Sequence, residues 1–478
     1  MTTPLEPAPA TPESAVGAPV LSRGAWRSRA SFLHEEDTRY LRFLIPPGLR
    51  VLELGCGAGH TLAALAPARG VGIDIDPRRI AEGRTAFPAL EFHAGDIEDE
   101  ATLDRIEGIF DIILLVDTIG SLSDCQTLLQ KLHRFATRET RLITAYFSHA
   151  WSPLLKIAEL IGWKMREGAQ NVLSPGDISG LAALADFQAI HSERRLLSPL
   201  RLLGVGRLVN RFIAPLPIIQ QLALRHYVVC RSLRAATEAA KSATVVIPAR
   251  NERGNIAAAV ARLPRFCDDI EIIFVEGHSS DGTLAEMHQV AASNPSWDIK
   301  VMTQPGKGKR DAVFAAFDIA RGDVLMILDA DLTVPPEQLP KFWEAISRGR
   351  GEFINGTRLV YPIANEAMRF LNLLANRGFS LLFSWLLSQR YTDTLCGTKV
   401  LRRSDYLRLK AGRDYFGDFD PFGDFDLIFG AAKLNLKTVE IPIRYAARTY
   451  GETQISRFRH GLLLLRMVVF AYRKIKAL

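Results

Sequence analysis

The chain has 478 residues, of which 48% are hydrophobic, and this length exceeds what one ordinary hydrophobic core organises. Two domains of roughly 200 to 230 residues each are therefore expected. A formal net charge of +7 suits nucleic acid, anionic lipid or phosphorylated substrates equally well, so charge alone does not select a partner. The five cysteines form no CxxC pair, which argues against a zinc site or a disulfide framework and favours a reducing compartment.

The N-terminal residues 1–25 predict a disordered tail. Residues 1–19 are rich in Pro, Ala and Thr, and they lack the basic start and apolar core of a signal peptide. We therefore expect a cytoplasmic protein. No apolar run in the sequence is long enough to span a bilayer, which leaves the membrane surface as the remaining mode of attachment.

Two series of strands and helices follow each other along the chain. The first covers residues 26–234, and the second covers 243–455 after a linker at 235–242 that carries little large apolar content. This alternation predicts an α/β protein with two doubly wound, Rossmann-like domains, in which ligands bind beyond the carboxyl ends of the strands. Strands are expected at 51–54, 71–74, 110–117 and 141–146, with a helix at 125–136, and then at 243–248, 271–275, 299–302 and 324–328.

A glycine-rich loop follows the first expected strand, which contains Glu53. Gly55, Gly57 and Gly59 alternate there, so the backbone can turn tightly and approach a ligand closely. A dinucleotide fingerprint would need a further glycine where His60 stands, so the spacing favours a methyltransferase loop over an NAD loop.

Two acidic residues follow neighbouring strands. Asp74 ends the second strand, where it is placed to accept hydrogen bonds from both ribose hydroxyls, and Asp96 ends another expected strand near the position of an adenine. Together with the glycine loop and the strand at 110–117, these segments resemble the ordered motifs of class I S-adenosylmethionine methyltransferases over about residues 30–190. The resemblance implies that Glu53, Gly55, Gly57, Gly59, Asp74 and Asp96 bind S-adenosylmethionine.

The sequence says less about the methyl acceptor than about the cofactor. Residues 116–120 lack the Asn-Pro-Pro-aromatic pattern of enzymes that methylate amino groups of bases or glutamine. This absence argues against nucleic acid as the methyl acceptor. A hydroxyl acceptor would need a general base, for which His133, His149 and Asp117 are candidates without a preferred one. A domain that keeps the fold without the activity is the alternative.

A second group of candidate site residues, all acidic, lies in the second series of strands and helices, residues 243–455. Asp329 and Asp331 flank one alanine directly after an apolar strand, and Glu252 and Glu276 stand in the loops after the first two strands of the second series. Carboxylate oxygens suit Mg²⁺ or Mn²⁺, which can bridge the diphosphate of a nucleotide-sugar while charge builds on it.

This half resembles family-2 glycosyltransferases over about residues 243–450, and among them the polyprenyl-phosphate glycosyltransferases similar to dolichyl-phosphate mannose synthase. The resemblance implies a glycosyltransferase-A fold, nucleotide-sugar contacts and a metal-binding pair, carried by Pro248, Ala249, Glu252, Glu276, Asp281, Asp329 and Asp331. Residues 393–399 are similar to an Asp-x-x-x-Gly-x-Lys/Arg segment on the acceptor side, which includes Asp393 and Lys399. Arg448 begins a segment similar to Arg-x-x-Gly-Glu-Ser-Lys, although Gln454 stands where a lysine is usual, which puts the exact acceptor in doubt.

The chemistry expected of this family is inversion at the anomeric carbon by direct attack. A lipid-phosphate acceptor is already ionised near neutral pH, whereas a hydroxyl acceptor would need a carboxylate base, for which Asp393 or Asp424 are candidates. Lys307 and Lys309 supply positive charge in a glycine-rich loop, close to where phosphate is expected.

The C-terminal residues 456–478 predict an amphipathic helix on a membrane surface. Arg459, Arg466 and Arg473 share one narrow stripe while apolar residues cover most of the rest, and residues 368–387 form another strongly apolar segment. Packing of both segments against the core or a partner subunit is the alternative. Nucleic acid is disfavoured, because the basic residues alternate with aliphatic ones.

The sequence therefore predicts a bifunctional enzyme on the inner face of a membrane. One half transfers a sugar from a nucleotide-sugar to a lipid-phosphate or glycan acceptor, and the other methylates a related intermediate. The alternatives are a glycosyltransferase with an inactive regulatory module and a non-catalytic membrane scaffold, which would have no need of Asp329 and Asp331.

Overall fold

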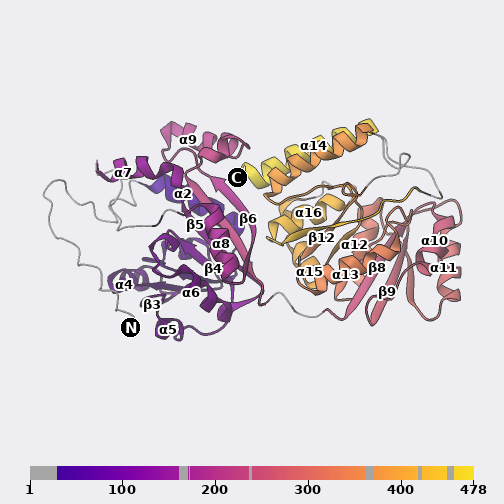
Figure 1. Ribbon diagram of the computed structural model, residues 1–478, viewed down its shortest axis with the longest axis horizontal. Helices are drawn as coiled ribbons and strands as arrows, with labels where there is room; N and C mark the ends of the chain where they lie inside the picture. The colour runs from indigo at the N-terminus through magenta and orange to yellow at the C-terminus, as the bar shows by residue number, and fades with distance from the viewer. Residues whose placement is uncertain are drawn as a thin grey trace, which may run out of the picture.

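The computed structural model describes residues 30–160, 171, 173–235, 240–361, 370–417, 423–448, 450 and 457–478. These residues form two α/β units that lie side by side, each built on one seven-stranded sheet (Figure 1). The predicted α/β class with two successive sheets is confirmed. Within the described ranges, every helix is either too short or too polar to span a bilayer.

The N-terminal sheet has the strand order β3-β2-β1-β4-β5-β7-β6. The neighbouring strands β3, β2, β1, β4 and β5 run parallel to one another, and β7 runs antiparallel to both β5 and β6. Its strands are β1 Arg50–Leu54, β2 Arg69–Asp74, β3 Glu91–Ala94, β4 Phe110–Val116, β5 Ala136–Phe147, β6 Phe187–Arg195 and β7 Arg225–Ser232. Its helices are α2 Ser31–Leu44, α3 His60–Ala64, α4 Pro77–Ala86, α5 Glu100–Leu103, α6 Cys125–Lys131, α7 Ser152–Leu160, α8 Pro175–Leu184 and α9 Val205–Leu208.

The C-terminal sheet has the order β10-β9-β8-β11-β13-β12-β14, in which only β13 is antiparallel to its neighbours. Its strands are β8 Ser242–Ala249, β9 Asp269–Glu276, β10 Asp298–Thr303, β11 Val324–Ile327, β12 Phe353–Thr357, β13 Lys399–Arg402 and β14 Thr438–Pro442. Its helices are α10 Arg253–Ala261, α11 Thr283–Ser293, α12 Lys309–Ile319, α13 Leu339–Ser347, α14 Phe370–Leu387, α15 Arg403–Ala411, α16 Asp424–Lys433 and α17 Arg457–Ala471.

The central strands are buried on both faces, as expected for parallel strands covered by helices. In β4, Ile113, Leu114 and Leu115 are fully buried, and these neighbours divide between two apolar clusters on opposite faces of the sheet. Several sequence expectations differ from the structure at their ends, and the strand expected at 141–146 already begins at Ala136. The helix expected at 125–136 ends as an α-helix at Lys131 and continues as a 3₁₀ turn, and the strand expected to reach Asp96 ends at Ala94.

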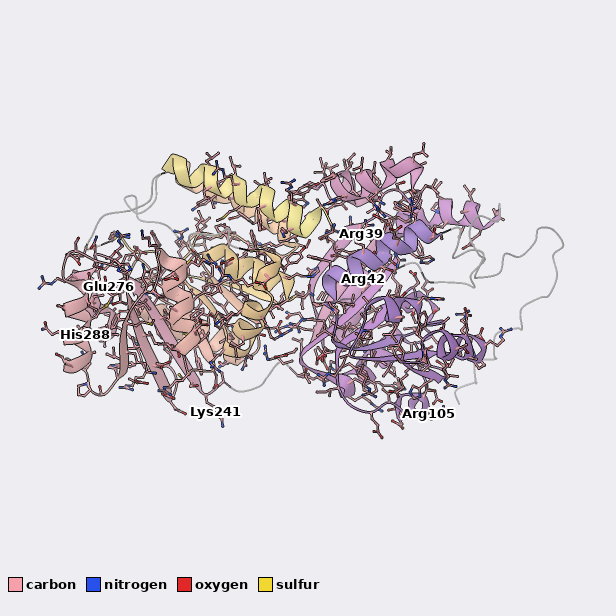
Figure 2. The ribbon with its side chains drawn as sticks, turned by 180° about the vertical axis from the view of Figure 1, so that it is seen from behind. Arg39, Arg42, Arg105, Lys241, Glu276 and His288 are labelled. Atoms are coloured by element: carbon pink, nitrogen blue, oxygen red, sulfur yellow. The ribbon has the colours of Figure 1, made fainter. Side chains whose placement is uncertain are left out.

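Both sheets direct the carboxyl ends of their parallel strands toward the same long edge of the molecule. In Figure 2, Arg105 and Lys241, which precede β4 and β8, lie at the bottom of the view, whereas Glu276 at the end of β9 lies well above Lys241. The α14 and C-terminal helices run along the top. Ligands of both sheets are therefore expected on the side of these helices.

Buried arginines of the N-terminal sheet join the two units. Arg141 donates from one nitrogen to both carboxylate oxygens of Glu352, each at 2.9 Å, and Arg138 binds Asp405 at 2.8 Å. Arg231 donates to the backbone oxygen of Gly349 at 2.6 Å. All of these side chains are buried, so the contact is an internal part of the fold rather than a surface salt bridge.

The C-terminal end of the chain adds a second contact between the units. Lys476 binds both carboxylate oxygens of Glu193 in β6, at 2.8 and 2.6 Å, and Arg195 donates to the backbone oxygen of Ile475 at 2.9 Å. Burial alone raises the pKa of Glu193, but Lys476 and Arg195 outweigh it and lower that pKa to about 2. The carboxylate is therefore ionised throughout the physiological range.

We expect Glu352→Ala to lower the free energy of unfolding by about 3–5 kcal/mol, because it leaves buried arginine charge without its partner. Burial raises the pKa of Glu352, but Arg141 and Arg231 hold it below its ordinary value. The contribution of the carboxylate is therefore present near neutral pH and is lost as the pH falls through its pKa in the folded state.

Urea unfolding at several pH values measures this effect. Glu337→Ala is the matched control, since its ion pair with Arg262 is exposed and contributes at most about 1 kcal/mol. Equal losses in the two variants would contradict the prediction.

Candidate active sites

The glycine loop after β1 has the shape that a bound cofactor needs. Gly57 adopts a φ of +58°, and its backbone N–H donates to a carboxylate oxygen of Asp74 at 2.8 Å. A Cβ added at Gly57 would meet nothing within 4 Å, so open space lies in front of the loop. The predicted residues Gly57 and Asp74 are thus brought together, and they fit the adenosyl group of S-adenosylmethionine.

Other predicted cofactor residues have different surroundings. Glu53 is buried and accepts a hydrogen bond from the backbone N–H of Leu62 at 3.1 Å, which ties β1 to the helix after the loop. Asp96 is exposed just beyond β3 and accepts from the backbone N–H of Glu98 at 2.9 Å. Gly55 and Gly59 both have positive φ, and a Cβ at either would overlap a neighbouring side chain.

A charge cluster around the buried Arg225 closes the same edge of the N-terminal sheet. Arg225, which is fully buried at the start of β7, binds Asp117 after β4 and binds Asp37 of α2 at 2.9 Å. Tyr227 also donates to Asp37. Asp117, one of the three possible bases, is therefore held in an ion pair. Sequence reasoning missed Asp37 and Arg225 because they meet only through the tertiary fold.

The histidines of this unit differ in their environment. His133 is hydrogen-bonded through both ring nitrogens, to Ser232 at 2.7 Å and to the backbone oxygen of Ala185 at 2.6 Å, which makes it structural. His149 is exposed just after β5. His226, which the sequence did not single out, is buried with no hydrogen-bond partner among the described residues. Burial, together with Arg194 and Arg225, lowers the pKa of His226 to about 4, so it is neutral near pH 7.

In the C-terminal unit, the loops after β8 and β9 are tied to each other. The backbone N–H of Asn251 donates to the Ser279 hydroxyl at 3.0 Å, and the backbone N–H of Arg253 donates to Asp281 at 3.2 Å. Asn251 and His278 have left-handed φ values of +57° and +60°, so each loop turns sharply at the end of its strand. The prediction that both loops face one site is consistent with this geometry.

The predicted nucleotide contacts lie in and around these two loops. Pro248 and Ala249 end β8, and the backbone oxygen of Ala249 accepts a hydrogen bond from Gly277 at 2.9 Å. Glu276 ends β9 and accepts from the backbone N–H of Ser279, which fixes the start of the second loop.

The acidic pair after β11 lies beside two basic side chains. Lys309 is 2.6 Å from Asp329, and Arg448 bridges Asp331 at 2.7 Å and Glu252 at 3.1 Å. Burial lowers the pKa of Lys309, but the charges of Asp329 and Asp424 outweigh it and raise that pKa above its ordinary value. Motifs from four separate stretches of the chain thus converge on the carboxyl edge of the sheet.

These residues fit a divalent metal in part. Asp329 and Asp331 supply hard oxygen ligands, and both are partly accessible. Within the described ranges no group of three or more His, Cys, Asp or Glu side chains is arranged as a metal site. A metal held by this pair would therefore take further ligands from a diphosphate and water.

Gly397 explains part of the acceptor-side motif. A Cβ at this position would lie 1.8 Å from a carboxylate oxygen of Asp329 and 2.6 Å from the Lys309 amine, so only glycine lets the backbone pass this closely. Lys399, two residues later, is fully buried, donates to the backbone oxygen of Cys396, and lies 3.7 Å from Asp424.

Asp393 does not have the surroundings of a catalytic base. It is fully buried, and Arg358 binds both of its oxygens, at 2.6 and 2.8 Å. Burial raises the pKa of Asp393, but Arg358 outweighs it and holds the pKa below its usual range. Its position indicates a structural role under the site. Gln454 lies outside the described residues.

Comparison with known proteins agrees with the two units. The Methyltransferase domain family model matches residues 45–178, and the Glycosyl transferase family 2 model matches residues 244–407. A solved SAM-dependent methyltransferase from Thermotoga maritima aligns with 43% of this chain and 92% of its own, at 16% identity and a TM-score of 0.32.

Two curated relatives match the C-terminal unit. An undecaprenyl-phosphate 4-deoxy-4-formamido-L-arabinose transferase of Aeromonas hydrophila is 34% identical over 113 residues, which is 23% of this chain and 35% of that protein. A dolichol-phosphate mannosyltransferase of Pyrococcus furiosus is 28% identical over 239 residues, 49% of this chain and 63% of that protein. The chain thus spans less than two-thirds of the length of either relative.

The strand orders, the loops at the carboxyl edges and these matches lead to one assignment. A methyltransferase fold is followed by a glycosyltransferase-A fold. The chain joins a region that matches the Methyltransferase domain model to a region that matches the Glycosyl transferase family 2 model, and the second region is similar to curated undecaprenyl-phosphate and dolichol-phosphate glycosyltransferases.

Proposed function

We propose that the C-terminal domain transfers a sugar from a nucleotide-sugar to a polyprenyl phosphate, and that the N-terminal domain methylates a related intermediate. The observation that carries the proposal is the pair Asp329 and Asp331 beside Lys309 and Arg448, at the carboxyl edge of a glycosyltransferase-A sheet. The two curated relatives are named as transferases of undecaprenyl phosphate and dolichol phosphate, and this supports a polyprenyl phosphate as the acceptor.

The state of Asp393 also favours a phosphate acceptor. A hydroxyl nucleophile would need a carboxylate base, but Asp393 is buried in its pair with Arg358, and Asp424 lies between Lys309 at 4.0 Å and Lys399 at 3.7 Å. An ionised phosphate oxygen needs little basic assistance. A phosphate nucleophile therefore needs no general base from these residues, whereas a sugar hydroxyl would need one.

In this mechanism the chain positions the donor and stabilises charge on the leaving diphosphate. Asp329 and Asp331 would hold Mg²⁺ or Mn²⁺, which supplies electrostatic stabilisation of that diphosphate when bound. Lys309 and Arg448 place two further cationic groups at the same edge. Glu252, Glu276 and Asp281 fix the loops that would surround the nucleotide.

In the N-terminal domain, the reaction depends mainly on alignment. Gly57 and Asp74 would hold the adenosyl group, and methyl transfer then requires the acceptor atom, the methyl group and the departing sulfur to lie in line. The ion pairs of the buried Arg225 with Asp37 and Asp117 give this edge a fixed wall against which an acceptor can be oriented.

We further propose peripheral attachment to the cytoplasmic face of a membrane through α14 and α17. Leu381 and Leu382 of α14 and Leu462, Leu465 and Val469 of α17 are exposed apolar side chains, and the two helices lie side by side along one edge (Figure 1). Arg466 and Arg473 are exposed among them. Such a face suits the boundary between headgroups and acyl chains.

Asp329→Asn and Asp331→Asn should each reduce metal-dependent sugar transfer on the order of a hundredfold or more, because each removes a charged ligand beside the diphosphate. The measurement is transfer of a radiolabelled sugar from a panel of nucleotide-sugars to polyprenyl phosphate in detergent. Asp298→Asn, in an exposed ion pair with Arg321 at the far end of the sheet, is the control and should stay active. Full activity of either site variant would refute the assignment.

Isothermal titration should show that the wild-type chain binds S-adenosylmethionine and that Asp74→Ala weakens binding at least about tenfold, since a carboxylate that accepts ribose hydroxyl hydrogen bonds is lost. Asp99→Ala, at an exposed helix N-cap, is expected to leave the affinity unchanged. Absence of binding to the wild-type chain would instead favour an inactive, regulatory N-terminal domain.

A further inference from the structure

The connection between β6 and β7 exposes an unusual amount of apolar surface. Residues 196–224 form short helical turns, and Leu203 there is fully exposed while Ile218 is 84% exposed. Further exposed side chains are Leu202, Leu208, Phe212 and Leu222. A group of neighbouring apolar side chains on one surface marks an interaction site more often than chance exposure does.

This connection lies at the active-site edge of the N-terminal sheet. It leaves β6 at Arg195 and enters β7 at Arg225, and both of these residues stand in register with the carboxyl end of β5 at Phe147. Arg225 also binds Asp117, which directly follows β4. The apolar connection therefore borders the edge where the methyl acceptor has to enter.

The surface continues without a break into the neighbouring elements. Trp151, just before α7, donates its indole N–H to the backbone oxygen of Leu222 at 2.8 Å. On the other side, Trp385 of α14 donates to the backbone oxygen of Pro215 at 2.9 Å, and Tyr472, just after α17, donates to that of Phe212. Figures 1 and 2 show α7, α9, α14 and the C-terminal helix along one long edge.

The connection at 196–224 carries only positively charged side chains among its ionisable residues. Residues 196–224 contain no Asp or Glu, and they carry Arg201, Arg207 and Arg211 among the apolar side chains. Arg201 and Arg207 pair with Glu35 of α2, whereas Arg211, also exposed, donates to the backbone oxygen of Ala477. The segments α14 and 457–476 also lack acidic residues. An apolar face with arginines at its margin matches acyl chains beneath anionic headgroups.

We propose that residues 196–224 together with α7 form a membrane-docking surface of the methyltransferase domain, which binds an anionic lipid bilayer in the same plane as α14 and α17. Both active-site edges then open toward the bilayer. The consequence for the substrate rests on the proposed function: the methyl acceptor is an amphiphile that reaches the N-terminal site from the lipid.

A second copy of the chain fits this surface less well. In a two-fold symmetric contact the same patch faces itself, so the arginines of both copies would be brought together, while Glu35 is already paired with Arg201 and Arg207 of its own copy. An anionic bilayer, in contrast, supplies the missing negative charge.

The test compares vesicle binding of matched full-length variants. The double variant Leu203→Glu/Ile218→Glu places two charges on the proposed surface, and Leu184→Glu is the control, because Leu184 is also exposed in this domain but lies near the opposite edge of the sheet. Flotation uses vesicles of phosphatidylcholine alone and vesicles that also contain phosphatidylglycerol.

We expect the wild-type chain to prefer vesicles with phosphatidylglycerol and to lose that preference at high salt. The double variant should partition about tenfold less strongly, and Leu184→Glu should match the wild type. Unchanged partitioning of the double variant would overturn the proposal, as would loss of a dimer in light scattering without any change in vesicle binding.

Three further measurements keep the result interpretable. Thermal unfolding checks that the double variant is folded, and Leu462→Glu/Leu465→Glu tests the surface of the glycosyltransferase domain separately. Binding of S-adenosylmethionine and sugar transfer in detergent should be the same in the double variant and the wild type. If both are absent from the wild type while vesicle binding follows the expected pattern, the proposed function fails and the docking surface stands.

Discussion

The buried contact between Arg141 and Glu352 fixes the arrangement on which the rest of the molecule depends. With Arg138, Arg231 and Asp405 it joins the two sheets through charges that are out of reach of water. Separating the domains would expose or unpair these charges, at a cost of several kcal/mol for each broken pair. The domains therefore have one relative orientation. Because of it, both carboxyl edges face the same way and the apolar surfaces of the two halves merge into one.

Local patterns in the sequence predicted the strands, the glycine loop and the acidic pair well. These features depend on neighbours in the chain: an apolar run, alternating glycines, or two aspartates directly after a strand. The buried arginines were not predicted, because Arg141 stands at the start of the strand expected at 141–146, where an exposed residue is equally common, and its partner Glu352 is 211 positions away. The cue available was weak: Arg138, Arg141 and Arg231 are among several arginines that lie in strands of this sheet, and the sequence does not distinguish them from the others.

In the candidate sites, too, local patterns indicated which residues are present, but they did not indicate how the fold surrounds them. Motif position placed Asp329, Asp331, Lys309 and Arg448 near phosphate groups, and the structure brings their side chains together, but the motifs gave no sign that Asp393 would be enclosed by Arg358. Burial is a property of the whole fold, and a motif match carries none of it. The apolar residues 196–224 posed a similar difficulty. Their composition resembles that of a core segment, and only the structure distinguishes a segment that packs inward from one that faces outward.

The shared direction of the two active-site edges has a consequence for substrate transfer. A polyprenyl-linked molecule that is held in a bilayer searches for its next site in two dimensions instead of three, and it does not have to leave the lipid between reactions. Two sites rigidly mounted above the same patch of bilayer would then exchange an intermediate by lateral diffusion over the width of one protein. No tunnel or covalent carrier would be required, since the membrane itself would connect the two reactions.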